Sequence, residues 1–126
     1  MTQLLLDTQL FVWAVMDSPR LGREARAMML DANRIYVSAV SIWEIAIKAR
    51  LGKITAEPQQ MLQAIADSGF SELAISAHHA AGVKKLALHH RDPFDRLLIA
   101  QAIAEPMPLL TSDPIMEKYS ELVVRV

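Results

Sequence analysis

The chain has 126 residues, of which 52% are hydrophobic and 21% are charged, and its formal net charge is −1. These values indicate one globular domain and exclude both an intrinsically disordered chain and a protein that is basic overall, as many nucleic-acid binders are. The absence of cysteine excludes disulfides, zinc–thiolate sites, iron–sulfur clusters and thiol nucleophiles.

In the first half of the chain, short apolar runs alternate with helical patterns. A run of three leucines predicts a strand over residues 4–6, and a helix over 8–16 follows it. A turn with a proline, which suits a helix start, precedes a second helix over 20–32. Clustered β-branched and aromatic residues predict a strand over 35–37, and an amphipathic helix over 38–50 comes next.

The second half continues this alternation, with proline or glycine at several boundaries. We expect helices over residues 58–68, 77–86 and 94–105, and a short helix opened by Asp113-Pro114. We expect strands over residues 73–75, 108–111 and 122–126.

Strands separated by helices predict an α/β fold with a small, mainly parallel sheet and helices on both of its faces. Residues 1–126 contain no internal repeat or linker and are expected to form a single domain. The N-terminus lacks a signal-peptide pattern, and no apolar run is long enough to span a bilayer. We therefore expect a cytoplasmic protein without a membrane segment.

Four acidic residues are expected at one edge of this sheet. Ligands of open parallel sheets bind beyond the carboxyl ends of the strands. Asp7 follows the first strand, where it could also simply begin a turn, and Asp113 follows the fourth. Glu44 and Asp95 lie in the expected first turns of two helices, and the N-termini of those helices reach the same edge.

Taken singly, these acids also have structural explanations. Asp92 and Asp113 each precede a proline and suit helix N-caps. Asp95 would favour the positive end of a helix dipole, and Ser41 and Glu44 have the spacing of a capping box.

Taken together, the acids indicate a cation site, because capping does not require them to gather. Clustered carboxylates repel one another and raise one another's pKa, which is costly unless a cation neutralises them. Ligation by oxygen alone favours hard ions such as Mg²⁺ or Mn²⁺. Such an ion can activate water for attack on a phosphodiester.

Four ordered stretches carry a resemblance to a known family. They are LLLDT at residues 4–8, VSAVSIWEIAIK at 37–48, HRDPFDRLLIAQA at 90–102 and LTSD at 110–113. With these motifs, the chain resembles the PIN-domain ribonucleases of the VapC type, the toxins of bacterial toxin–antitoxin pairs. The resemblance covers nearly the whole chain.

The resemblance implies a three-layer α/β/α sandwich and a metal-dependent endoribonuclease that uses Mg²⁺ or Mn²⁺. The catalytic, metal-binding acids would be Asp7, Glu44, Asp95 and Asp113. It also implies RNA as substrate, a small VapB-like antitoxin that inserts into the acidic groove, and a homodimer. A chain of this length suits a toxin better than a multidomain processing factor.

Four further residues could contact the substrate or a metal ligand. Ser38 could orient water or phosphate, or cap a helix, and Asp92 could be a ligand or an N-cap. Arg96 could stabilise a phosphate or carboxylate, or lie solvated at the surface. Ser112 stands where many relatives carry asparagine or aspartate. Ser41 could also orient water or phosphate, but its spacing from Glu44 favours a helix-capping role.

The histidines and several basic residues have less specific patterns. His78-His79 and His89-His90 lack the spacing of a histidine metal motif and are interpreted as structural. Arg91 could bind the RNA backbone. Three residues could form a basic rim or simply a solvated face: Lys48, Arg50 and Lys53.

Two other functions stay open at this point. A phospho-accepting receiver module also holds acids around Mg²⁺, but its usual pair of adjacent acids is missing here, because Thr8 follows Asp7. It also usually has a lysine after its last strand motif, and none follows Thr111 until Lys118. A catalytically inactive binding partner is the second alternative, and the four intact acids argue against it.

Overall fold

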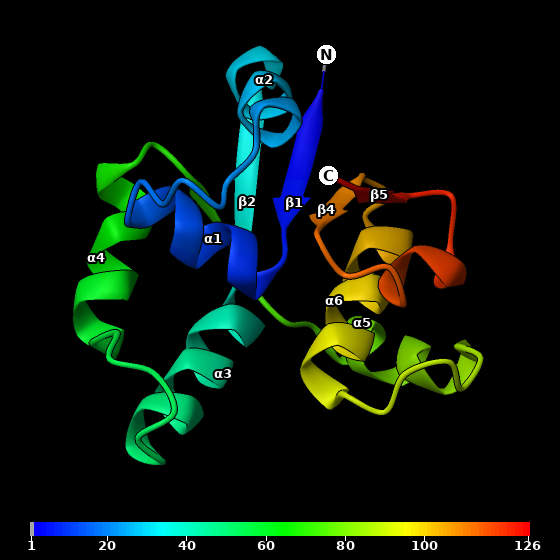
Figure 1. Ribbon diagram of the computed structural model, residues 1–126. Coiled ribbons are helices and arrows are strands. Elements are labelled where there is room, and N and C mark those ends of the chain that lie inside the picture. The colour runs from blue at the N-terminus through cyan, green and yellow to red at the C-terminus, as the bar shows by residue number, and fades with distance from the viewer. Residues whose placement is uncertain (1) are drawn as a thin grey trace.

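The computed structural model describes residues 2–126 and shows a central sheet between two groups of helices (Figure 1). The strands are β1 (Gln3–Leu6), β2 (Arg34–Ser38), β3 (Ser71–Leu73), β4 (Leu109–Thr111) and β5 (Val123–Arg125). Their order is β3, β2, β1, β4, β5, and each neighbouring pair is parallel. The predicted α/β fold with a parallel sheet is confirmed.

Helices cover both faces of this sheet, as predicted. They are α1 (Thr8–Val15), α2 (Arg23–Asp31), α3 (Ala39–Arg50), α4 (Pro58–Asp67), α5 (Ala77–Gly82) and α6 (Pro93–Ala104). Two 3₁₀ helices, η1 (Val83–Lys85) and η2 (Met116–Tyr119), complete the chain. Helices α1, α2 and α4 lie on one side of the sheet, and α5 and α6 lie on the other (Figure 1). No helix formed by residues 2–126 has both the length and the apolar character needed to cross a membrane.

The three leucines of β1 divide between two hydrophobic cores because successive strand residues point to opposite faces. Leu4 and Leu6 pack into the core under α1, α2 and α4, whereas Leu5 packs into the core under α6. Helix α3 belongs to both, since its Val40 joins the second core and its Ile45 joins the first. This helix therefore contributes to the cores on both sides of the sheet.

The large aromatic side chains take several environments. Phe11 is fully buried, and Trp13 packs against the same core. Trp43 remains 52% exposed and meets the Phe94 ring edge-on, with 4.9 Å between ring centroids.

Helix α2 starts later than predicted. Gly22 is its N-cap, and Pro19 lies instead in the preceding turn. The guanidinium of Arg26 holds this turn by donating to the carbonyls of Ser18 (2.8 Å) and Leu21 (2.9 Å). These side-chain contacts hold Pro19 in the turn, although proline suits a helix start.

Strand β3 also differs from the prediction, lying at residues 71–73 instead of 73–75. Its last residue, Leu73, pairs with Ser38, where β2 ends and α3 begins. The residues after Leu73 therefore have no strand beside them to extend the ladder.

The helix predicted over residues 77–86 is divided into α5 and η1. The helix predicted after Pro114 is the short 3₁₀ helix η2.

Candidate metal centre

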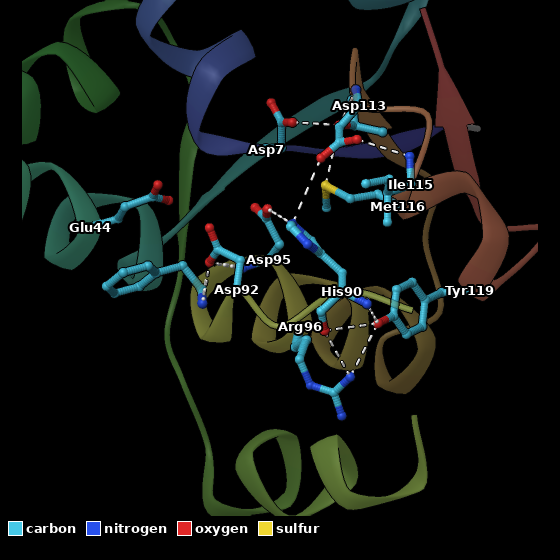
Figure 2. A network of polar contacts seen from close by, with 12 residues as sticks. Asp7, Glu44, His90, Asp92, Asp95, Arg96, Asp113, Ile115, Met116 and Tyr119 are labelled. Carbon is cyan, nitrogen blue, oxygen red and sulfur yellow. Dashed lines mark hydrogen bonds and ion pairs between the residues drawn. The ribbon is translucent and has the colours of Figure 1, made fainter. Parts of the chain in front are cut away.

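A groove of about 500 Å³ opens at the carboxyl edge of the sheet, where β1 and β4 end and α3 and α6 approach. Five carboxylates and two lysines are among the side chains that line it: Asp7, Glu44, Asp92, Asp95, Asp113, Lys48 and Lys53. All four acids predicted to converge are therefore brought to one groove. Figure 2 shows Asp7, Asp95 and Asp113 close together, with Glu44 on α3 across the groove.

Asp7 is held rigidly at the end of β1. Its Oδ1 accepts the backbone N–H of Leu10 at 2.8 Å, which caps α1, and its Oδ2 accepts the hydroxyl of Thr111 at 2.6 Å. Burial raises the pKa of Asp7 to about 6, although both hydrogen bonds act in the opposite direction. The carboxylates of Glu44 and Asp113 raise it further. A cation beside Asp7 would remove this penalty.

Asp95 lies in the first turn of α6, as predicted, and faces the groove. Burial, followed by the neighbouring charge of Asp92, raises the pKa of Asp95 to about 7. A hydrogen bond from Nε2 of His90 to Oδ2 of Asp95, at 2.9 Å, opposes this rise. Both Asp7 and Asp95 thus carry charges that the metal-free groove only partly stabilises.

Glu44 lies in the second turn of α3, not the first as predicted, because the N-cap of this helix is Ser38. Its Oε2 accepts a hydrogen bond from Nζ of Lys48, one helical turn later, and this bond raises the pKa of Lys48. Its Oε1 is buried and has no hydrogen-bond partner among residues 2–126. A buried carboxylate oxygen without a partner is costly and marks a place where a cation fits.

The capping-box interpretation of Ser41 and Glu44 is wrong for the same reason. Ser41 is inside α3, where its hydroxyl accepts a hydrogen bond from the Thr8 hydroxyl at 2.9 Å. Ser41 therefore ties α3 to α1 instead of capping a helix.

Asp92 and Asp113 combine local structure with a position in the groove. Oδ1 of Asp92 accepts the N–H groups of Phe94 and Asp95 and caps α6. Oδ1 of Asp113 accepts the N–H of Ile115 at 2.9 Å, and its Oδ2 lies 3.8 Å from Nε2 of His90. The N-cap interpretation of Asp92 is confirmed, and the same side chain lines the groove.

Ser38 and Ser112 are not among the residues of the described chain, 2–126, that line the groove. Ser38 is fully buried, where its hydroxyl accepts the N–H of Val40 and donates to Oε1 of Gln101 at 2.6 Å. These contacts give Ser38 a capping role and a link to α6. Ser112 is half-buried next to Asp113.

Arg96 forms no ion pair with a carboxylate of residues 2–126 and is not simply solvated, while its contact with a phosphate stays a prediction. Its guanidinium donates to the hydroxyl of Tyr119 and to a series of backbone carbonyls: Val83, Leu86, Ala87 and His90. Figure 2 shows it on the side of α6 away from Asp95. Arg96 therefore fixes the chain between η1 and α6, which explains why the helix predicted over 77–86 ends early.

Tyr119 and Arg96 together form a clamp on the segment before α6, and the contribution of the Tyr119 hydroxyl to stability can be measured. This hydroxyl accepts the N–H of His90 at 2.6 Å and a guanidinium N–H of Arg96 at 3.1 Å. We expect Tyr119→Phe to lower the free energy of unfolding by about 1 kcal/mol, because two donors lose their acceptor. Urea unfolding measures this, with Tyr36→Phe as the control, since the Tyr36 hydroxyl makes no hydrogen bond within residues 2–126. Equal effects of the two substitutions would contradict the clamp.

His90 is the residue that sequence reasoning missed. The absence of a histidine spacing motif indicates a structural role, yet its ring contacts Asp95 and Asp113. The available signal was its position two residues before the Asp92-Pro93 helix start, which brings it to the same helix end as Asp95. The structural interpretation does fit His79, which is buried, forms a capping box with Ser76 and contacts Glu105.

Of the residues considered for a basic rim, Lys48 and Lys53 line the groove. Arg50 and Arg91 are exposed and are not among the lining residues of the chain over 2–126. Lys48 and Lys53 only partly offset the five acids, so the groove carries a net negative charge. The donor set and the unpartnered Oε1 of Glu44 both fit a divalent cation.

The fold can be assigned to a known protein family. The PIN domain family matches residues 4–122, almost the whole chain. The chain belongs to the PIN-domain family. The predicted PIN-like α/β fold around a parallel sheet is therefore confirmed.

Solved structures support the PIN fold over the full length. A chain in the crystal structure of VapBC2 from Rickettsia felis bound to a promoter DNA fragment is 19% identical, with a TM-score of 0.72, covering 99% of this PIN domain and 98% of that chain. A chain of DNA-bound VapBC from Salmonella typhimurium is 17% identical, with a TM-score of 0.68 and coverages of 100% and 98%. A chain of a toxin–antitoxin complex from Klebsiella pneumoniae is 18% identical, with a TM-score of 0.65, and the match covers 95% of this PIN domain and 94% of that chain. A search of curated proteins found no match.

Proposed function

We propose that this PIN domain is a divalent-metal-dependent endoribonuclease and the toxin of a toxin–antitoxin pair acting in the cytoplasm. The observation that carries the proposal is the groove in which Asp7, Glu44, Asp95 and Asp113 gather with one buried carboxylate oxygen left without a partner. Membership of the PIN family supports nuclease chemistry at this edge and argues against a receiver module.

The four acids would hold Mg²⁺ or Mn²⁺, which supplies activation of water and neutralisation of phosphate charge when bound. Asp7 is the most rigid of them, since both of its oxygens are hydrogen-bonded to the chain. Lys48 keeps Glu44 turned into the groove through their ion pair. Lys53, exposed at the groove, is placed to meet the RNA backbone, whose phosphates attract basic side chains.

Metal removal tests the nuclease proposal. Purified protein with Mg²⁺ or Mn²⁺ is expected to cut a single-stranded RNA, and excess EDTA is expected to abolish cleavage, because it removes the ion that would activate water. Added Mn²⁺ should restore it. Gel analysis of end-labelled RNA measures this. Undiminished cleavage in excess chelator would overturn the metal requirement, and no cleavage with any metal would favour an inactive binding partner.

Two observations support an antitoxin as the partner of this PIN domain: the negative charge of the groove and the toxin–antitoxin complexes among the structures similar to it. A small antitoxin would place a basic side chain against these acids, as arginine pairs readily with carboxylates. A second copy of the PIN domain is the other expected partner. Co-expression with a neighbouring antitoxin-like gene should yield a stable, inactive complex. A chain that never associates with that product, and is harmless to cells, would contradict the toxin role.

A further inference from the structure

The imidazole of His90 lies inside the acidic cluster, close enough to share an ion with two carboxylates. Its Nε2 is 2.9 Å from Oδ2 of Asp95 and 3.8 Å from Oδ2 of Asp113. One donor atom from each of these three residues lies within 4.8 Å of the others. Adjacent ligands of an octahedral ion with bonds near 2.1 Å stand roughly 3 Å apart. The 2.9 Å separation from Asp95 matches this spacing, whereas the 3.8 Å separation from Asp113 would have to shorten when an ion binds. Figure 2 shows the ring pointing between the two acids.

The protein holds the backbone of His90 from the side opposite the acids. The N–H of His90 donates to the Tyr119 hydroxyl at 2.6 Å, and its carbonyl accepts from that hydroxyl at 3.2 Å and from Arg96 at 3.3 Å. Arg96 also fixes the carbonyl of Ala87, three residues earlier. This anchoring keeps a histidine on a connecting segment in one place, as a metal ligand requires.

A second, independent feature of the groove points to an ion. Glu44 is 4% exposed, and its Oε1 has no hydrogen-bond partner among residues 2–126 although it belongs to a groove-lining side chain. The cluster of His90, Asp95 and Asp113 is therefore not just a set of surface acids. Asp95 and Asp113 line the same groove as this buried oxygen of Glu44, and His90, which is not among the lining residues described within 2–126, contacts both of these acids.

We infer that His90 is a direct ligand of the metal ion in this groove, together with Asp95 and Asp113, through the lone pair of Nε2 in the tautomer that carries its proton on Nδ1, so that the ion takes the place of the Nε2 proton that Asp95 accepts. The inference deepens the proposed function and rests on the metal site that function requires. An imidazole ligand suits first-row transition ions, whereas Mg²⁺ prefers oxygen. The imidazole would then strengthen the preference of the groove for Mn²⁺ over Mg²⁺ beyond that of carboxylates alone.

Pulsed electron paramagnetic resonance of the Mn²⁺-loaded chain tests this without any substitution. A coordinated imidazole gives a ¹⁴N coupling to the Mn²⁺ electron spin, and we expect that coupling in the parent. It should disappear in His90→Asn and persist in His78→Asn, whose histidine is exposed on α5. Circular dichroism in EDTA establishes that each variant is folded.

Calorimetric titration gives the matching thermodynamic result. His90→Asn should lose roughly tenfold or more in Mn²⁺ affinity and much less in Mg²⁺ affinity, while His78→Asn should match the parent for both ions. Mn²⁺ bound without nitrogen coupling would overturn the inference and leave the nuclease proposal standing. Nitrogen coupling without RNA cleavage would support the ligand and overturn the nuclease. Failure to bind Mn²⁺ at all would overturn both.

Discussion

Without metal, an Asp95→Asn variant is expected to be as stable as the parent or more stable, while its RNA cleavage falls by orders of magnitude. Burial and the charge of Asp92 oppose ionisation of Asp95, so removing its charge relieves repulsion in the groove. Asparagine can still accept the hydrogen bond from His90, but it is a poorer, uncharged metal ligand. Such an exchange of stability against activity is common at functional sites.

The alternative explanation of Asp95 predicts the opposite sign. If its carboxylate only favours the positive end of α6, Asp95→Asn should lose about 0.3–1 kcal/mol of stability and keep its activity. Glu24→Gln is the matched control, since Glu24 is an exposed acid in the first turn of α2. Thermal melts in EDTA and in Mn²⁺, beside a cleavage assay, decide between the two. Mn²⁺ should raise the melting temperature of the parent more than that of the variant.

The metal-free protein is also expected to lose stability as the pH rises from 5.5 to 8. The folded pKa values of Asp7, about 6, and Asp95, about 7, lie above the ordinary value of 3.8. The folded state therefore binds more protons than the unfolded state over this interval, and stability is lost as each group ionises. Each group lowers the free energy of unfolding by up to about 1.4 kcal/mol per pH unit, so the total loss is on the order of a few kcal/mol.

Urea unfolding in EDTA at several pH values measures this loss. Saturating Mn²⁺ should reverse it, because the ion binds the ionised acids of the folded state and its affinity rises with pH. A double variant, Asp7→Asn with Asp95→Asn, should show a flatter pH profile without metal. A parent whose stability rises between pH 5.5 and 8 in EDTA would contradict uncompensated burial of these acids.

The sequence was sufficient to predict the gathering of the acids, because sheet topology decides it. Asp7 directly follows β1, and Asp113 lies two residues after the end of β4. Because β1 and β4 are parallel, their carboxyl ends bring both acids to one edge of the sheet. Asp95 was predictable from the Asp92-Pro93 helix start. Glu44 was assigned to the wrong turn of α3 yet still faces the groove, on the same helix face as Lys48.

Contacts between distant segments could not be predicted in this way. The periodicity of apolar residues predicts helices and strands, but it does not predict which backbone carbonyls of a loop accept hydrogen bonds from an arginine. The clamp made by Arg96 and Tyr119 could therefore not be predicted. The metal role inferred for His90 depends on that clamp, and the histidine was judged only by the absence of a spacing motif. The boundaries of β3 and α5 were misplaced because strand pairing and side-chain hydrogen bonds, not local propensity, end them.

The most direct measurement follows RNA cleavage and Mn²⁺ occupancy in the same samples. The rate of cutting an end-labelled RNA is recorded as free Mn²⁺ is raised from zero in a buffered chelator, while electron paramagnetic resonance reports the fraction of protein that holds the ion. If Asp7, Glu44, Asp95 and Asp113 hold the ion that cleavage needs, the rate will rise in proportion to that fraction and reach a plateau with it. Asp7→Asn should stay near zero throughout. A full rate at zero occupancy, or a rate that Asp7→Asn does not change, would contradict the metal-dependent site.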